Sequence, residues 1–115
     1  MHAREIGNGI HCIAMVHWER RLFDSLIPLP DGTSYNAYLV RGNSATALID
    51  SADPALQEEL MRELEGLGHL DYVISQHSEQ DHSGAIPVVL KRFPNATLVC
   101  STKARDLLTT HLHVP

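Results

Sequence analysis

The sequence is poor in the residues that define several common classes of protein. Its 115 residues include two cysteines, Cys12 and Cys100, which form no Cys-x-x-Cys pair. A disulfide framework is therefore excluded, and we predict two buried thiols in a reducing compartment. Basic residues are also few, because nine Lys and Arg against 14 Asp and Glu give a formal net charge of −5. Without a basic surplus, neither nucleic acid nor an anionic membrane is an expected partner.

Long apolar runs and targeting segments are missing as well. No apolar stretch approaches the roughly 20 residues that a membrane-spanning helix needs, and the N-terminal charges are not followed by a long apolar region. Seven Gly and six Pro are too few for a low-complexity or collagen-like chain. The remaining composition, 43% hydrophobic and 20% charged, is that of one small globular domain, which we expect in the cytoplasm.

The first half of the chain is rich in β-forming residues, arranged in short runs between turn residues. A loop over 28–33 and a tight turn at Gly42-Asn43-Ser44 separate these runs. The predicted strands cover residues 9–16, 17–23, 34–41 and 45–50, with the last two forming a hairpin.

Helical periodicity begins after Asp53-Pro54, which supply an N-cap and a proline at the first helical position. Leucines at helical spacing follow, and Gly66 or Gly68 is expected to end this helix. A β-meander followed by βα units predicts an α/β fold, with helices covering a sheet. The later predicted elements are a strand over 71–75, a helix from about Ser83, a buried strand over 96–100 and a helix capped by Ser101 or Thr102.

One short segment, His77-x-Glu79-x-Asp81-His82, is dense in metal-binding side chains. It follows a predicted strand and precedes a helix, where α/β sheets place their sites. In an extended loop His77, Glu79 and Asp81 would project to one side, whereas the adjacent Asp81 and His82 would point apart. The alternative is a solvated polar loop, but four such residues in this context favour a metal site. The Glu79 carboxylate favours iron or manganese over zinc.

This motif resembles that of the oxygen-binding diiron domain of flavodiiron proteins, a branch of the metallo-β-lactamase superfamily. The hydrolytic branches typically have His-x-His-x-Asp-His, so Glu79 is the flavodiiron form. Nearly the whole chain takes part in the resemblance. The similar stretches are Trp18 with Leu22-Phe23-Asp24, then 32–40, 48–50, 71–77 and 81–84.

The resemblance implies that residues 1–115 form the N-terminal half of an αββα sandwich. It also implies that His77 and Glu79 bind one iron and Asp81 the other, with His82 a variable ligand or just outside the coordination shell. The family reduces O2 to water or NO to nitrous oxide and receives electrons through FMN, from donors such as rubredoxin or a flavoprotein reductase. Asp50, at a strand end, would either orient the metal loop or cap a turn.

Several sequence features that are typical of flavodiiron proteins are not found in this sequence. It lacks the later His, Asp and His ligands, a phosphate loop for FMN, the flavodoxin-like domain and rubredoxin-type cysteine pairs. We therefore expect half of a dinuclear site, inactive alone and without FMN. An uncovered sheet face should drive homodimerisation or recruit a completing polypeptide.

Two other interpretations of the protein's function remain open from the sequence. One is a zinc-dependent hydrolase of the same fold that uses a metal-bound hydroxide. The other is a truncated, non-catalytic domain that dimerises or binds metal weakly.

Overall fold

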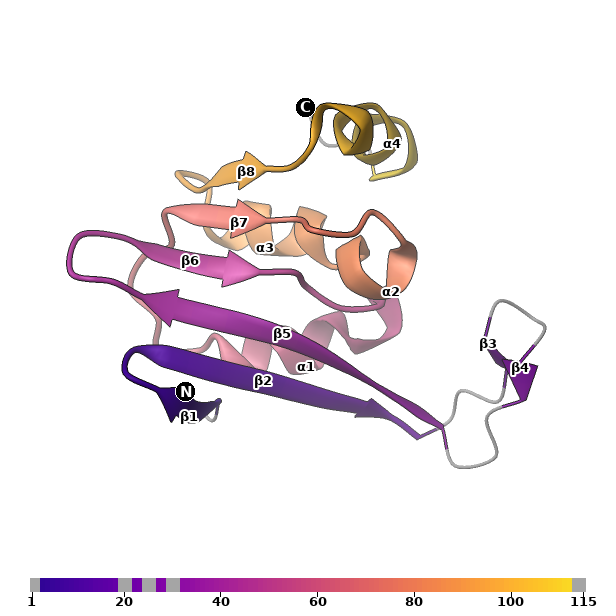
Figure 1. The fold of residues 1–115 in the computed structure, drawn as a ribbon, viewed down its shortest axis with the longest axis horizontal. Helices are drawn as coiled ribbons and strands as arrows, with labels where there is room; N and C mark the ends of the chain where they lie inside the picture. The colour runs from indigo at the N-terminus through magenta and orange to yellow at the C-terminus, as the bar shows by residue number, and fades with distance from the viewer. Residues whose placement is uncertain (1–2, 19–21, 24–26, 29–31, 113–115) are drawn as a thin grey trace.

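A six-stranded sheet with helices on one face forms the framework of the protein (Figure 1). The computed structural model describes residues 3–18, 22–23, 27–28 and 32–112. The sheet order is β1-β2-β5-β6-β7-β8, and β3 and β4 form a separate two-stranded ribbon. The strands are β1 (Arg4–Gly7), β2 (Ile10–His17), β3 (Leu22–Phe23), β4 (Ile27–Pro28), β5 (Thr33–Arg41), β6 (Thr46–Ile49), β7 (Tyr72–Ile74) and β8 (Thr97–Val99).

The sheet changes from antiparallel to parallel halfway across. Neighbours from β1 to β6 pair antiparallel, whereas β7 pairs parallel with both β6 and β8. Parallel neighbours require crossover connections, which the helices supply. The predicted β-meander followed by βα units is therefore confirmed. The helical elements are η1 (Pro54–Leu56), α1 (Gln57–Glu63), α2 (Gln80–Ser83), α3 (Ile86–Arg92) and α4 (Thr102–Leu112).

The helix starts follow the capping residues in the sequence. The Asp53 carboxylate accepts a hydrogen bond from the Ala55 N–H at 2.9 Å, and Pro54 opens the first, 3-10 turn before α1. Ser101 is the cap of α4, because its hydroxyl accepts from the Ala104 N–H at 3.1 Å. The first helix ends at Glu63, earlier than expected, and Gly66 lies in the following turn with a φ of +88°.

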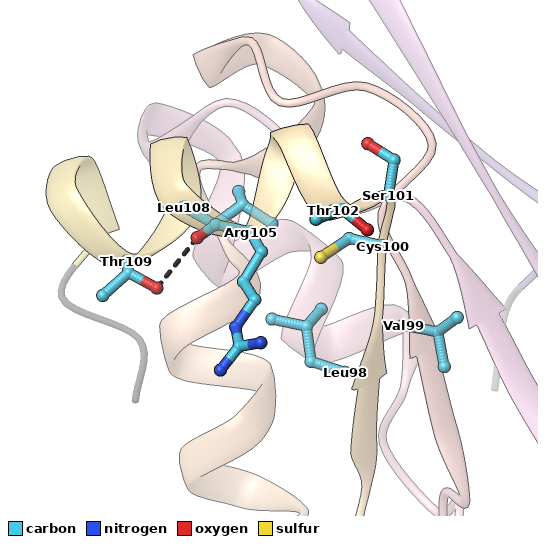
Figure 2. A pocket seen from close by; sticks show the side chains of 8 residues that line it. All are labelled: Leu98, Val99, Cys100, Ser101, Thr102, Arg105, Leu108 and Thr109. Atoms are coloured by element: carbon cyan, nitrogen blue, oxygen red, sulfur yellow. Dashed lines mark hydrogen bonds between the residues drawn. The ribbon is translucent and has the colours of Figure 1, made fainter.

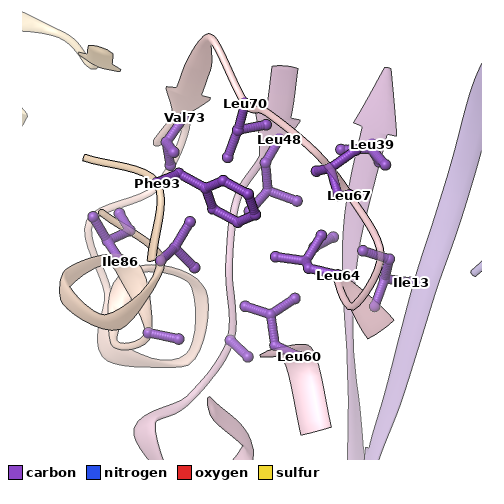
Figure 3. Close-up of a cluster of buried hydrophobic side chains, with 14 of the residues drawn as sticks. Ile13, Leu39, Leu48, Leu60, Leu64, Leu67, Leu70, Val73, Ile86 and Phe93 are labelled. Atoms are coloured by element: carbon purple, nitrogen blue, oxygen red, sulfur yellow. The ribbon is translucent and has the colours of Figure 1, made fainter. Parts of the chain in front are cut away.

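The hydrophobic core lies between the sheet and the helices on its back (Figure 3). Leu39, Leu48 and Val73 are in register on β5, β6 and β7, and all three are fully buried. Leu60 and Leu64 follow from the α1 region, while α3 contributes Ile86 and Val89.

The opposite face of the sheet carries no helix in the part of the chain that is described (Figure 1). The partly exposed side chains of Ile10, Val16, Tyr72 and Val99 lie on it. The uncovered face expected from the sequence is thus present. None of the described helices is long and apolar enough to cross a bilayer.

Several sequence-based boundaries need correction. A first strand, β1, was not predicted, and Pro28 of the predicted 28–33 loop belongs to β4. Within the predicted 17–23 strand, β2 ends at His17 and β3 begins at Leu22. Residues 19–21 of that prediction, residue 24 of the similar stretches and residues 29–31 of the predicted loop lie outside the described residues. The last strand is not buried, because β8 is the sheet edge and Thr97 and Val99 are exposed. Both cysteines are half-buried rather than fully buried.

Candidate metal centre

The polar motif spans the connection between β7 and a short helical turn. Glu79 has extended backbone angles, φ −64° and ψ 151°, and occupies the N-cap position of α2. Asp81 and His82 lie inside that turn, so the expectation of an extended loop through Asp81 is wrong. The expected single helix from Ser83 is also wrong, because α2 ends there and α3 begins at Ile86.

A buried serine explains why the chain turns here. The Ser83 hydroxyl lies 2.9 Å from the carbonyl oxygens of both Ser78 and Glu79. The Ser83 N–H also donates to the Glu79 carbonyl at 2.8 Å. These contacts close one helical turn directly after Glu79 and bring the two halves of the motif together.

The four predicted ligands form two adjacent pairs. His77 Nε2 lies 3.6 Å from Glu79 Oε1, and His82 Nε2 lies 3.5 Å from Asp81 Oδ2. The prediction that Asp81 and His82 point apart is therefore wrong, because the helical turn directs both toward one point. Such N···O separations are long for hydrogen bonds. Two donors each about 2.1 Å from one cation, at about 90–110°, would lie roughly 3.0–3.4 Å apart, so small side-chain rotations suffice.

The two pairs lie next to each other. The imidazole centroids of His77 and His82 are 5.0 Å apart. The His77 and Glu79 side chains are half exposed, whereas Asp81 is 12% exposed. Among the described residues, no three His, Cys, Asp or Glu side chains already converge as a metal-binding group. The motif thus places two His–carboxylate pairs side by side without a group of three convergent ligands among the described residues.

A third pair shows that the spacing alone is not distinctive. His69 Nε2 lies 3.5 Å from Asp71 Oδ2 at the other end of β7. That carboxylate already accepts a hydrogen bond from the Thr46 N–H at 2.8 Å and fixes the start of β6. What distinguishes the motif is the presence of a second pair beside the first.

Asp50 joins the two ends of the metal loop. It is 2% exposed and adopts a left-handed backbone with φ 64°, uncommon for a residue other than glycine. Its carboxylate accepts hydrogen bonds from the Gln76 N–H at 3.1 Å and from Gln76 Nε2 at 2.9 Å. Its Oδ2 also lies 3.3 Å from His82 Nδ1. These contacts favour the loop-orienting role over the turn-capping one.

Two further residues shape the loop: Ser51, which the sequence analysis did not name, and Gly84, which it named only within the similar stretch 81–84. Both the N–H and the hydroxyl of Ser51 donate to the His82 carbonyl at 2.8 Å. A side chain on Gly84 would overlap the Pro54 ring and lie 2.6 Å from the Gln80 carbonyl oxygen. The two small residues after the Asp-His pair, Ser83 and Gly84, were the available sequence signal for this position.

A cavity of about 290 Å³ opens beside the second pair. Asp50, Gln76, Asp81 and His82 form one side of it, and strand β5, which continues past the end of β6, forms the other. The β5 wall includes Asn36 and Tyr38, neither of which was predicted to be near the site. A small molecule could therefore reach the Asp81–His82 pair from the open face of the sheet.

The donor set fits iron. Two imidazoles and two carboxylates form the mixed nitrogen and oxygen set that iron and manganese accept. The buried Asp50 carboxylate behind His82 supplies the outer contact that usually fixes a metal-binding imidazole.

Comparisons with known proteins show the family to which the chain belongs. The family description "Metallo-beta-lactamase superfamily" matches residues 30–115. The coenzyme F420H(2) oxidase of Methanothermobacter marburgensis is 36% identical over 115 residues, which cover 95% of this chain and 28% of that protein. Among solved structures, the rubredoxin oxygen:oxidoreductase of Desulfovibrio gigas superposes with a TM-score of 0.88 at 29% identity, covering 98% of this chain and 29% of that one. The flavodiiron protein of Giardia intestinalis gives 0.85 at 26% identity, covering 96% and 27%.

The fold, the motif and the match define the class: this chain belongs to the metallo-β-lactamase superfamily. Within that superfamily its relatives are flavodiiron proteins, as the Glu79 form of the motif predicts. The chain spans about a quarter of the length of these relatives. Its sheet and helices match the N-terminal part of their α/β sandwich.

Proposed function

We propose that this chain carries part of the diiron centre of a flavodiiron-type oxidoreductase that reduces O2 to water, NO to nitrous oxide, or both. His77 and Glu79 hold one iron, and Asp81 and His82 hold the other. One observation carries the proposal: two His–carboxylate pairs, each with an N···O distance of 3.5–3.6 Å, lie side by side.

Iron bound here supplies reversible one-electron redox chemistry and open positions for a diatomic substrate. The Glu79 and Asp81 carboxylates balance the positive charge of two neighbouring cations. The Asp50 carboxylate lies 3.3 Å from His82 Nδ1, at the side of the ring opposite Nε2 and Asp81, and so helps to orient the imidazole. The buried contacts of Ser51 and Ser83 keep the loop from rearranging when the cations bind.

Other polypeptide must supply the remaining parts of such an enzyme. The relatives that match are three to four times longer, and FMN, a flavodoxin-like domain and further ligands are expected from outside these 115 residues. We propose rubredoxin or a flavoprotein reductase as the electron donor, because the Desulfovibrio gigas relative is a rubredoxin oxygen:oxidoreductase. The expected compartment is the cytoplasm, and the chain alone is expected to be inactive.

Metal selectivity tests this proposal. Purified protein is titrated anaerobically with Fe(II), Mn(II) and Zn(II) in turn, and the bound metal is measured by elemental analysis. The His69→Gln/Asp71→Asn variant is the matched control, because it removes a His–Asp pair of the same spacing at the other end of the sheet. We expect Fe(II) to be retained equally by the wild type and by this control.

Two results would contradict the proposal. Retention of zinc alone would support the hydrolase reading. Retention of no metal would support a non-catalytic domain.

A further inference from the structure

Gln76 binds the buried Asp50 carboxylate at both of its oxygens. The two residues follow neighbouring parallel strands, β7 and β6, in which Ile74 is paired with Ile49. Both therefore leave the sheet at the same edge. The Gln76 N–H donates to Oδ1 at 3.1 Å, and its side-chain Nε2 donates to Oδ2 at 2.9 Å. The first of these hydrogen bonds comes from the backbone, so only the second depends on the residue being glutamine.

The oxygen that the Gln76 amide binds is also the one nearest to His82. Asp50 Oδ2 lies 3.3 Å from His82 Nδ1. The carboxyl group of an aspartate turns easily about its Cβ–Cγ bond, because that torsion has a broad, two-fold profile. A hydrogen bond at each oxygen opposes this rotation and keeps Oδ2 directed at the imidazole. Without the side-chain amide, the backbone bond at Oδ1 alone would not fix the plane of the carboxylate.

Burial makes this contact more important than its position on the surface suggests. The Asp50 side chain is 2% exposed, so water does little to replace a hydrogen bond that it loses. Gln76 itself is exposed, and it lines the cavity beside Asp81 and His82. Substitution of an exposed side chain usually leaves the core intact. The amide can therefore be removed without disturbing the packing of the fold.

We propose that Gln76 is a positioning residue for the second His–carboxylate pair and acts through Asp50 on the ring of His82. The consequence for iron rests on the proposed function, in which His82 is a ligand, whereas the contact itself exists without metal. Loss of a direct outer contact of a metal-binding imidazole typically lowers metal affinity by about 10–100-fold. Gln76 is one contact further out, so removal of its amide should lower affinity less, by roughly 3–10-fold.

The motif contains a second glutamine that serves as the matched control. Gln80 is exposed like Gln76, but it lines a different cavity, beside Leu107 and Leu112 of α4. Methionine has nearly the length of glutamine and no amide. Gln76→Met and Gln80→Met therefore remove the same group at two positions of one loop.

A variant on α4 controls for the general loss of one side-chain hydrogen bond. The Thr109 hydroxyl donates to the Arg105 carbonyl at 2.8 Å (Figure 2). Thr109→Val removes this bond, which lies away from the metal loop. Both control variants should leave the ring of His82 as it is in the wild type.

The ring resonances of the metal-free protein test the proposal directly. Two-dimensional proton–nitrogen correlation spectra at fixed pH report the ring nitrogens of His77 and His82 separately. We expect Gln76→Met to shift those of His82 more than those of His77. Gln76→Ala is a second variant that removes the amide and should give the same result. Gln80→Met should match the wild type.

Removal of the Asp50 side chain shows whether Gln76 acts through it. Asp50→Gly takes away the carboxylate and suits the left-handed backbone at this position, which has a φ of 64°. In that background Gln76→Met should have little further effect on the His82 shifts, because residues that act through one shared contact are not additive. An equal effect with and without the carboxylate would overturn the proposal. So would wild-type His82 shifts in Gln76→Met, or an equal change in Gln80→Met.

Iron affinity is then measured separately by anaerobic Fe(II) titration. Gln76→Met should bind iron roughly 3–10-fold more weakly than the wild type, and Gln80→Met should bind it equally well. A wild type that binds no iron would overturn the proposed function, while the ring shifts would still decide the role of Gln76. Iron binding with unchanged ring shifts in Gln76→Met would overturn only the positioning role.

Discussion

The Asp50 carboxylate lies 3.3 Å from His82 Nδ1 and binds Gln76 through both its backbone and its side-chain nitrogen. It thereby connects the start of the metal loop to its end. The side chain that does this is 2% exposed and sits on a left-handed backbone. Such a constrained, buried carboxylate behind a histidine is the usual arrangement for fixing an imidazole ligand.

Asp50→Asn should lower metal affinity by about 10–100-fold while leaving the fold intact. Asparagine tolerates a left-handed backbone and can still accept from Gln76, so stability should change by no more than about 1 kcal/mol. Isothermal titration with Fe(II) measures the first effect, and denaturant unfolding the second. Asp71→Asn, at the opposite end of β7, is the control and should bind metal like the wild type. Equal affinity for the Asp50→Asn variant would show that Asp50 serves only the fold.

Glu79→His should move the metal preference toward zinc. The substitution recreates the His-x-His-x-Asp-His pattern, and imidazole suits zinc better than a carboxylate does. The ratio of zinc to iron affinity, measured by competition between the two metals, should rise by roughly tenfold or more. Glu79→Gln separates the effect of losing the carboxylate charge from the effect of gaining an imidazole, because it removes the charge without adding a ring. Identical ratios in wild type and Glu79→His would mean that Glu79 is not a ligand.

Gly84→Ala should destabilise the protein by about 1–3 kcal/mol, as overpacking of a tight site does. The new methyl group would overlap the Pro54 ring and crowd the Gln80 carbonyl that closes α2. Gly68→Ala is the matched control, because a Cβ there meets nothing within 4 Å. The difference between the two variants in urea midpoint measures the effect. An unchanged urea midpoint in the Gly84→Ala variant would contradict this prediction and indicate that the turn at Pro54 moves aside without a cost in stability.

Much of the fold is readable from local sequence chemistry. The Gly42-Asn43-Ser44 turn sets the β5–β6 hairpin, and Asp53-Pro54 sets the start of the first helix. Local signals fail where tertiary contacts decide. The apolar run at residues 96–100 predicted a buried strand. The structure has a half-exposed strand there, because β8 lies at the edge of the sheet and the sheet order is not readable from the run itself.

The motif itself shows the same limit. Its residue types predicted four candidate ligands, and the structure places them in two neighbouring His–carboxylate pairs, while metal binding by them stays a prediction. Their arrangement was not predictable from alternation along a strand, because the Ser83 hydroxyl bonds back to Ser78 and Glu79 and folds the segment into a helical turn. Asn36 reaches the cavity because β5 continues past the end of β6, and Tyr38 reaches it because it pairs with Ile49 at that end; only the strand register reveals both.

Anaerobic Fe(II) binding to paired-ligand variants tests the central claim most directly. One variant, His77→Gln/Glu79→Gln, removes the first pair, and the other, Asp81→Asn/His82→Gln, removes the second. Each should lose half of the iron bound by the wild type, and the quadruple variant should lose all of it. Iron content unchanged in either double variant, or fully lost in both, would contradict two separate iron-binding pairs.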